Sequence, residues 1–206
     1  MDHKEIPDIV VGRLPLYLRA LQGMSQEGRQ VTSSQELGER LGISAAQIRK
    51  DLSQFGEFGK QGTGYGIQYL CDQIRKILKV DRVWDVVVVG AGDIGSAVAH
   101  YQGFANRGFQ VTLVFDNDPE KVGKQEGEFI VKDSVHMVDE IKRAGIRVAM
   151  VAVPGSDAQE VTNQLVEAGV KAILNYAPVS LNVPKDVRLQ YIDPASHLQR
   201  MTYYLE

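Results

Sequence analysis

The pattern of hydrophobic and polar positions changes once along this 206-residue chain, near residue 80. Before that point, apolar residues recur every three or four positions, which is the spacing of helices that bury one face. From Asp85 onward, short apolar runs alternate with helical patterns, and strands are expected over 86–90, 110–115, 147–153, 171–174 and 188–192. Such alternation predicts a parallel sheet with helices on both of its faces. The chain is therefore expected to hold a helical domain followed by a doubly wound α/β domain.

The helical part contains the outline of a helix-turn-helix. VTSSQELGERLGI offers a serine N-cap and a stop at Gly42, and a second helix is expected over 44–55, beginning at Ser44. Two short helices joined by a glycine-containing turn are typical of this motif. After them, EFGKQGTGYGIQYL returns to Ile67 and Tyr69 at period two, which predicts a glycine-tipped β-hairpin. A connecting helix is then expected to end near Lys79.

The stretch VVVVGAGDIG carries the strongest chemical signal of the chain. Gly90 permits a tight turn out of a strand, Gly92 lets the backbone approach a pyrophosphate, and Gly95 lets the following helix pack closely. The second strand, VTLVFD, ends in Asp116, 21 positions beyond Gly95, where a ribose-binding carboxylate is expected. No arginine follows Asp116 directly, so NAD(H) is favoured over NADP(H).

Two later segments are expected at the same edge of the sheet. Val153 and Pro154 follow one predicted strand, and Asn175, Tyr176 and Pro178 follow another. Ligands of open parallel sheets lie outside the carboxyl ends of the strands, so these segments are expected near the nicotinamide half. Ordinary turn chemistry is the alternative for both segments.

Acid–base groups for hydride transfer are harder to find. None of His3, His100, His136 and His197 stands at the end of a predicted strand, and an enzyme of this kind needs a proton donor or acceptor at the nicotinamide. Tyr101 could face the cofactor but has alanine, not lysine, four positions later. The evidence for turnover is therefore poor.

The second helix of the helix-turn-helix has a polar face suited to nucleic acid. Opposite its apolar positions stand Gln47, Lys50 and either Ser53 or Gln54, with Arg49 beside them. Arginine and lysine bind phosphates or guanine edges, and glutamine binds base edges. Lys60 at the predicted hairpin tip could reach a phosphate or the minor groove. A solvated amphipathic helix explains this face equally well.

The composition limits the class of protein but does not indicate its function. The chain is 44% apolar and 24% charged, with a net charge of −3, which is ordinary for a globular protein. Cys71 is the only cysteine, so an intrachain disulfide and a cysteine-rich metal site are excluded. The N-terminus lacks the features of a signal peptide, and no apolar run is long enough to span a membrane. A cytoplasmic protein without a membrane partner is expected.

Several motifs in the same order resemble one known family. AQIRKDL, FGEFG followed by GxGY, VVVVGAGDIGSA, FDNDPEKVG and AGVKAILNYAPVSLNVP closely resemble the Rex family of redox-sensing transcriptional repressors, nearly end to end. The resemblance implies an N-terminal winged helix-turn-helix domain, a Rossmann doubly wound parallel sheet and a C-terminal domain-swapped helix. The corresponding boundaries are 1–80, 81–193 and 194–206. It also implies a homodimer, joined through the C-terminal helix, that binds operator DNA and dissociates from it when NADH binds, with no catalytic residue and no metal.

The resemblance assigns roles to particular positions of this chain. The positions that match the DNA-contacting elements are Ser44, Gln47, Arg49, Lys50, Ser53, Lys60 and Tyr65, of which Tyr65 has a structural alternative. The cofactor positions for NADH and NAD+ are Gly90, Ala91, Gly92, Asp93, Ile94, Gly95, Tyr101, Asp116, Asp118, Lys121, Val153, Pro154 and Tyr176. Asp93 is expected to point away from the pyrophosphate, and an apolar nicotinamide pocket is expected to favour NADH.

A switch and a rival function complete the expectations. Arg19, Tyr101 and Asp193 match positions that can form a polar switch between domains, with Asp193 exchanging between tyrosine and arginine partners. Leu198, Met201, Tyr204 and Leu205 are expected on one face of the last helix. The alternative function is a small NAD-dependent dehydrogenase or a nucleotide-binding subunit of a larger enzyme.

Overall fold

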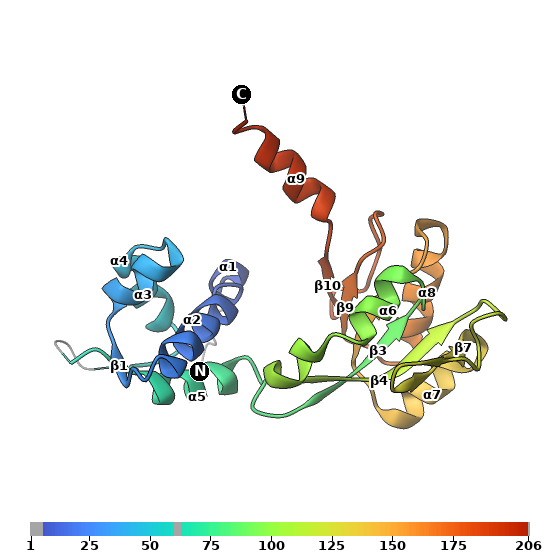
Figure 1. The fold of residues 1–206 in the computed structure, drawn as a ribbon, viewed down its shortest axis with the longest axis horizontal. Helices are drawn as coiled ribbons and strands as arrows, with labels where there is room; N and C mark the ends of the chain where they lie inside the picture. Colours follow the sequence, from blue (N-terminus) through green and yellow to red (C-terminus); the bar gives the residue numbers. More distant parts are fainter. Residues whose placement is uncertain (1–5, 60–62, 206) are drawn as a thin grey trace. The chain divides into compact units, whose positions relative to one another are not determined.

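The computed structural model describes residues 6–59 and 63–205, except for the side chain of Glu126. The chain divides into two compact units, Met1–Arg82 and Val83–Glu206, each drawn in Figure 1. The helices in the described parts of the chain include none that is long and apolar enough to cross a membrane.

The first unit is a helical cluster with one small pair of strands. Its elements are α1 (Asp8–Val11), α2 (Leu14–Gln26), β1 (Val31–Thr32), α3 (Ser34–Leu41), α4 (Ala45–Leu52), β2 (Tyr65–Gly66) and α5 (Ile67–Ile77). Apolar side chains of α2, α3, α4 and α5 form a single core, which includes the fully buried Tyr17, Leu37, Ile48 and Ile74. The helix-turn-helix expected from the sequence is therefore α3 and α4, held against α2 and α5.

The predicted glycine-tipped hairpin is wrong in its second strand. β2 pairs antiparallel with β1, which precedes the helix-turn-helix, and Ile67 and Tyr69 belong to α5. Ile67, Leu70 and Ile74 are buried while Tyr69 is 52% exposed, so helical spacing overrides the short period-two pattern. Lys60, at the expected tip, lies outside the described residues.

The second unit is built on a six-stranded parallel sheet. Its strands are β3 (Trp84–Val89), β4 (Phe109–Asp116), β7 (Lys132–Asp133), β8 (Val148–Val151), β9 (Ala172–Asn175) and β10 (Arg188–Tyr191), in the order β10-β9-β8-β3-β4-β7. All five strands expected from the sequence are present. The edge strand β7 was not predicted, because two residues carry no usable pattern. A separate small hairpin, β5 (Gln125–Glu126) with β6 (Phe129–Ile130), was not predicted either.

Helices cover both faces of this sheet (Figure 1). They are α6 (Asp93–Ala99), α7 (Met137–Ala144) and α8 (Gly155–Glu167), with short 3-10 turns over Gln102–Arg107 and Ser134–His136. Val87 and Val89 of β3 pack with residues of α7 and α8, whereas Val86 and Val88 pack with Ala99 of α6. Successive strand residues point to opposite faces, so the run of four valines supplies both cores at once.

The last helix, α9 (Pro194–Thr202), leaves the sheet after β10 and projects away from it (Figure 1). Asp193 caps its N-terminus by accepting a hydrogen bond from the Ala195 amide at 3.0 Å. The expected apolar residues Leu198, Met201, Tyr204 and Leu205 are between 61% and 74% exposed. This chain therefore leaves an apolar segment uncovered at its C-terminal end.

The end of α5 has an unusual cap next to the boundary between the units. The Val80 amide donates to the Arg75 carbonyl at 2.9 Å and the Lys79 amide to the Lys76 carbonyl at 3.1 Å, which is a Schellman arrangement. Lys79 occupies the left-handed position of this cap with φ of 58°, where glycine is usual.

Candidate dinucleotide site and nucleic-acid interface

A cavity of about 770 Å³ opens at the carboxyl ends of β3, β4 and β8. Nine of the cofactor residues expected from the sequence line it: Gly90, Gly92, Asp93, Ile94, Asp116, Asp118, Lys121, Val153 and Pro154. A volume of this size suits a cofactor or a drug-sized ligand, and the place is where parallel sheets bind nucleotides. The sheet order reverses here, because β4 and β8 lie on opposite sides of β3.

The three glycines of the cavity turn are needed for different reasons. A Cβ at Gly90 would lie 2.4 Å from the Ala152 carbonyl oxygen, and one at Gly95 would lie 1.7 Å from the Gly90 oxygen. Both glycines are therefore required by packing. A Cβ at Gly92 would meet no protein atom within 4 Å, and Gly92 lines the cavity. The fold does not need glycine there, but a ligand approaching the backbone does, so the residues present fit a dinucleotide.

Asp116, at the end of β4, stabilises this glycine turn through hydrogen bonds. Its carboxylate, 6% exposed, accepts hydrogen bonds from the Ala91 amide at 2.7 Å and from the Asp118 amide at 2.9 Å. Lys121 lies 3.3 Å from the same carboxylate. Burial alone would raise the pKa of Asp116, but the two amides and Lys121 outweigh it and lower the pKa. A charged Asp116 thus connects the β4 edge to the glycine turn.

Asp93, expected to point away from the pyrophosphate, is among the residues that line the cavity. It is the first residue of α6, it is exposed, and it lines the cavity wall. A carboxylate at the first turn of a helix interacts favourably with the helix dipole, which accounts for its presence there.

The two tyrosines expected at the nicotinamide are absent from the described lining of the cavity. Tyr101 is 50% exposed and packs edge-on against Phe104, with ring centroids 5.0 Å apart. Tyr176 is half-buried among residues of the α6 face, and this burial raises the pKa of its phenol. Asn175 is buried and hydrogen-bonds the Ala177 backbone, so it shapes the turn after β9.

In the first unit, serine caps start both helices of the helix-turn-helix. Ser33 accepts a hydrogen bond from the Glu36 amide at 3.1 Å, and Ser44 accepts one from the Gln47 amide at 3.2 Å. The turn between α3 and α4 is only three residues long, and the buried Ile48 and Leu52 fix the inner face of α4. These contacts leave the opposite face of α4 open to solvent.

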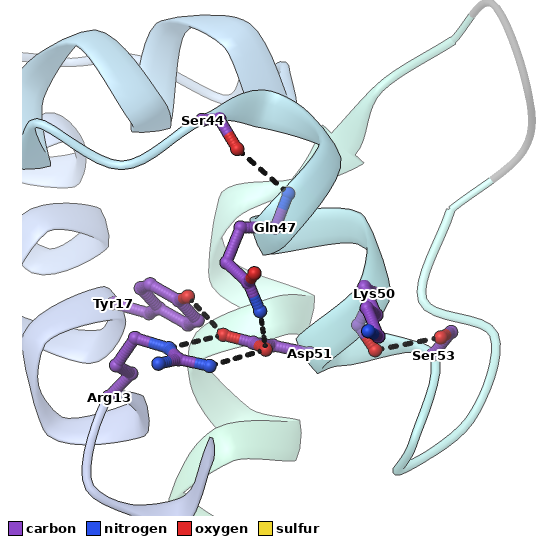
Figure 2. A network of polar contacts seen from close by, with 7 residues as sticks. All are labelled: Arg13, Tyr17, Ser44, Gln47, Lys50, Asp51 and Ser53. Carbon is purple, nitrogen blue, oxygen red and sulfur yellow. Dashed lines mark hydrogen bonds and ion pairs between the residues drawn. The ribbon is translucent and has the colours of Figure 1, made fainter. Parts of the chain in front are cut away.

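A buried carboxylate ties α4 to α2 (Figure 2). Asp51 is fully buried and accepts hydrogen bonds from Arg13 Nε at 2.6 Å, Arg13 Nη2 at 2.7 Å and the Tyr17 hydroxyl at 2.6 Å. Gln47 completes the set, donating from Nε2 at 2.7 Å. Burial would raise the pKa of Asp51, but these donors outweigh it and the pKa falls. Burial, followed by the hydrogen bond to Asp51, raises the pKa of Tyr17.

Of the residues expected to contact DNA, Arg49, Lys50 and Ser53 are exposed, whereas Gln47 and Tyr65 contact the interior of the first unit. Arg49 and Lys50 are exposed on α4, and Arg49 Nη1 donates to the Ser34 hydroxyl at 2.9 Å. Ser53 is exposed at the end of α4 and donates to the Lys50 carbonyl at 2.9 Å (Figure 2). Gln47 instead points inward to Asp51, and Tyr65 packs partly against the core. Burial raises the pKa of Tyr65, while the charge of nearby Arg49 acts in the opposite direction.

Known proteins similar to this chain match both units. Residues 5–53 match the family model "Putative DNA-binding protein N-terminus" and residues 81–179 match "CoA binding domain". Redox-sensing transcriptional repressors Rex are 49% identical over 199 residues in Chloroflexus aggregans and 52% identical over 203 residues in Roseiflexus sp.. The alignments cover 97% and 98% of this chain and 94% and 92% of those proteins.

The chain belongs to the Rex family of redox-sensing transcriptional repressors. A crystal structure of RSP with β-NAD+ and operator DNA has a TM-score of 0.93 and 36% identity to this chain, covering 97% of it and 92% of RSP. The structure of RSP with β-NADH has a TM-score of 0.89 and 34% identity, with 98% and 95% covered. The predicted family and fold class are therefore confirmed.

Membership of the Rex family also decides between repressor and enzyme. Curated Rex relatives in the two organisms above are repressors, so the dehydrogenase alternative is set aside. The decision rests on sequence identity over nearly the whole chain. The individual cofactor, DNA and switch contacts of this Rex protein remain predictions.

Sequence reasoning missed functional residues in both units of this Rex chain. The local sequence pattern does not single out Asp51, although it stands between Ile48 and Leu52 on the inward face of α4, where an acid must have a partner. Asp157 and Glu160 of α8 also line the cavity. Their spacing of three on one helix face, directly after Val153 and Pro154, is a signal that could have placed them there.

Proposed function

We propose that this chain is a homodimeric repressor that binds operator DNA and releases it when NADH occupies the cavity of the second unit, so that it responds to the NADH/NAD+ ratio. The observation that carries the proposal is the coexistence in one chain of an exposed basic helix-turn-helix face and a cavity whose Gly92 is needed only by a ligand. RSP, which shares the fold over nearly its whole length, has been crystallised with operator DNA and with each form of the dinucleotide. A repressor of this kind works in the cytoplasm, where it meets both DNA and NAD(H).

Arg49 and Lys50 on α4 are the proposed centre of the DNA contact. Both are exposed, and α4 is fixed by its serine cap and by Asp51 (Figure 2). Ser44 and Ser53, at the two ends of α4, are placed to bind phosphates, with Lys60 and Tyr65 beyond the helix. Gln47 reaches a base edge only by exchanging its bond to Asp51.

The cavity residues would hold the dinucleotide from its two ends. The amides of Asp93 and Ile94, at the start of α6 beyond Gly92, would bind the pyrophosphate, with Ala91 and Gly95 shaping the turn. Asp116, Asp118 and Lys121 would bind the adenosine ribose, and Val153 and Pro154 the nicotinamide side. The bound dinucleotide supplies charge and bulk here rather than a reaction. Carboxylates at the ribose edge disfavour the phosphorylated riboses of NADP(H) and coenzyme A.

The exposed apolar residues of α9 support dimerisation through that helix. Leu198, Met201 and Leu205 are each more than 60% exposed in a segment that projects from its own unit. Covering such a segment with a second copy removes apolar surface from water. We propose that Arg19, Tyr101 and Asp193 then couple the cofactor state to the DNA-binding units, with Tyr101 and Tyr176 contacting cofactor or partner in the dimer.

The test is a DNA-binding titration with the full-length protein. A fluorescent duplex selected from random sequence by the protein itself is titrated in the presence of NADH, NAD+, NADPH or coenzyme A. NADH should weaken DNA binding at least tenfold, and the other three ligands should not. DNA binding that ignores NADH, or that responds equally to coenzyme A, would refute the proposed function.

Two variants should separate DNA binding from NADH binding. Arg49→Ala with Lys50→Ala should weaken DNA binding and lower the slope of log K against log salt by roughly 2 in magnitude, while NADH affinity stays unchanged. Gly92→Val should abolish NADH binding and leave a repressor that NADH cannot release. Sedimentation of the chain truncated after Asp193 tests the dimer, which should become a monomer.

A further inference from the structure

Acidic residues outnumber basic ones in the lining of the cavity, and the positive charge lies at one end of it. Its lining includes five carboxylates, from Asp93, Asp116, Asp118, Asp157 and Glu160, and one ammonium group, from Lys121. Lys121 lies 3.3 Å from the Asp116 carboxylate and 3.8 Å from that of Asp118, so it neutralises the β4 end of the cavity. The opposite end has no such cation among the residues described as its lining.

Asp157 and Glu160 define this uncompensated end. Both are exposed on the cavity side of α8, one turn apart, directly after Val153 and Pro154 at the end of β8. Neither forms an ion pair with another residue in the described parts of the chain, and Glu160 only accepts a hydrogen bond from Gln164 Nε2 at 3.3 Å. Their charges are therefore available to act on whatever occupies the cavity.

NADH and NAD+ differ in charge at one place only. The oxidised nicotinamide ring carries a positive charge, the reduced ring is neutral, and the pyrophosphate and adenosine are identical. Carboxylates near the ring thus stabilise the oxidised form relative to the reduced form, whereas carboxylates near the ribose or pyrophosphate affect both forms equally. The expected apolar pocket, built here from Val153, Pro154 and Val161, acts in the opposite direction.

We propose that Asp157 and Glu160 set the redox selectivity of the cavity, by favouring the positively charged nicotinamide of NAD+ and so opposing the preference for NADH. The inference rests on the proposed function, because it takes NAD(H) as the ligand and the β8 end as the nicotinamide side. Its consequence is that more NADH, relative to NAD+, is needed to release DNA than an uncharged α8 would require.

The experiment measures the dissociation constants of NADH and NAD+ for the full chain by calorimetry. Asp157→Asn and Glu160→Gln should each raise the ratio of the NAD+ constant to the NADH constant by roughly two- to fivefold, the effect of one charge about 8 Å away in a largely aqueous surrounding. The double variant should show the larger change. The shift should shrink as salt is raised from 0.05 to roughly 0.5 M, because the charges become screened.

Matched variants distinguish selectivity from a general effect on binding. Asp157→Glu keeps the charge and should keep the wild-type ratio. Asp118→Asn removes a cavity carboxylate at the ribose end, and should change both constants by the same factor. Glu167→Gln, at the far end of α8 and paired with Lys142, should change neither.

The outcomes separate this inference from the proposed function. If the α8 variants change both constants equally, the carboxylates only repel the pyrophosphate and the inference is overturned, while the proposed function stands. If wild-type protein binds neither dinucleotide, both are overturned. A ratio that rises with Asp157→Asn and Glu160→Gln but not with Asp118→Asn supports the assignment.

Discussion

Asp51 in the first unit and Asp116 in the second are both buried carboxylates, but they are satisfied in different ways. Asp51 is held by side chains, from Arg13, Tyr17 and Gln47 (Figure 2). Asp116 is held chiefly by two backbone amides, with Lys121 at 3.3 Å. The first arrangement fixes one helix against another, and the second fixes the path of a loop.

This difference indicates what each unit has to preserve. A helix that presents Arg49 and Lys50 must keep its orientation, and the side chains around Asp51 provide that by joining α4 to α2. A turn that presents backbone amides to a ligand must keep its main-chain path, and Asp116 provides that by binding the Ala91 amide. The two carboxylates should therefore fail differently when they are changed.

The largest effect is expected from Asp51→Ala. It leaves the guanidinium of Arg13, whose side chain is 19% exposed, without its partner. Breaking a buried ion pair in this way destabilises a protein by about 3–5 kcal/mol, and the lower end applies to a partner with some solvent access. Circular dichroism, to which the helices of both units contribute, should show earlier unfolding of the first unit, whereas fluorescence of Trp84, the only tryptophan, should report an unchanged second unit.

The control for this change replaces the whole pair. Asp51→Leu with Arg13→Met exchanges the ion pair for apolar side chains and should recover part of the lost stability, since such replacements are often neutral but the buried Tyr17 hydroxyl still loses its acceptor. If this stable double variant loses DNA binding, the polar network is needed to orient α4 for DNA and not only to stabilise the first unit. A stable double variant with full DNA affinity would contradict the positioning role.

A smaller stability change, and a larger functional one, is expected from Asp116→Ala. The buried amide of Ala91 loses its acceptor, which costs about 1–3 kcal/mol and should appear in the Trp84 fluorescence transition. Dinucleotide affinity should fall at least tenfold as the turn loosens, measured by calorimetry with NADH. Asp139→Ala, an exposed acid on α7, should change neither measurement.

Acid should destabilise both units through these groups. The pKa values of Asp51 and Asp116 are both lowered in the folded protein, so their stabilising effect is complete above the ordinary aspartate pKa of about 3.9. It is lost as the pH falls further, through the folded pKa, by up to about 1.4 kcal/mol per pH unit for each proton taken up. In the Asp51→Leu, Arg13→Met variant, the free energy of unfolding measured with denaturant should depend less on pH below about pH 4 than it does in the wild type. This difference should appear in the circular dichroism signal and not in the Trp84 fluorescence.

The smallest effect is expected at the boundary between the units. Lys79→Gly relieves a left-handed conformation and should stabilise the first unit by about 0.5–1 kcal/mol, with the Trp84 transition unchanged. Lys76→Gly, inside α5, should instead destabilise it by about 1 kcal/mol. Equal effects of the two glycines would mean that the cap carries no strain.

The contrast between the two carboxylates also explains what the sequence could predict. The proposed dinucleotide site depends on main-chain geometry, which glycine spacing and a strand-end acid indicate, and nine of the residues expected there line the cavity. Asp51 depends on residues 38 and 34 positions away in the chain, and no local pattern connects it to Arg13 and Tyr17. The hairpin error at Ile67 has the same origin, because burial against α2 decides between helix and strand there.

Gly92 has a consequence for how defects in this protein would show themselves. Since a Cβ at this position touches no protein atom within 4 Å, we expect a variant that blocks the cavity from here to fold with a stability close to that of the wild type. A screen that measures only protein stability would not detect the variant. Its defect would appear only when NADH is added, as DNA that stays bound in the purified system and as target genes that stay silent in a reduced cell.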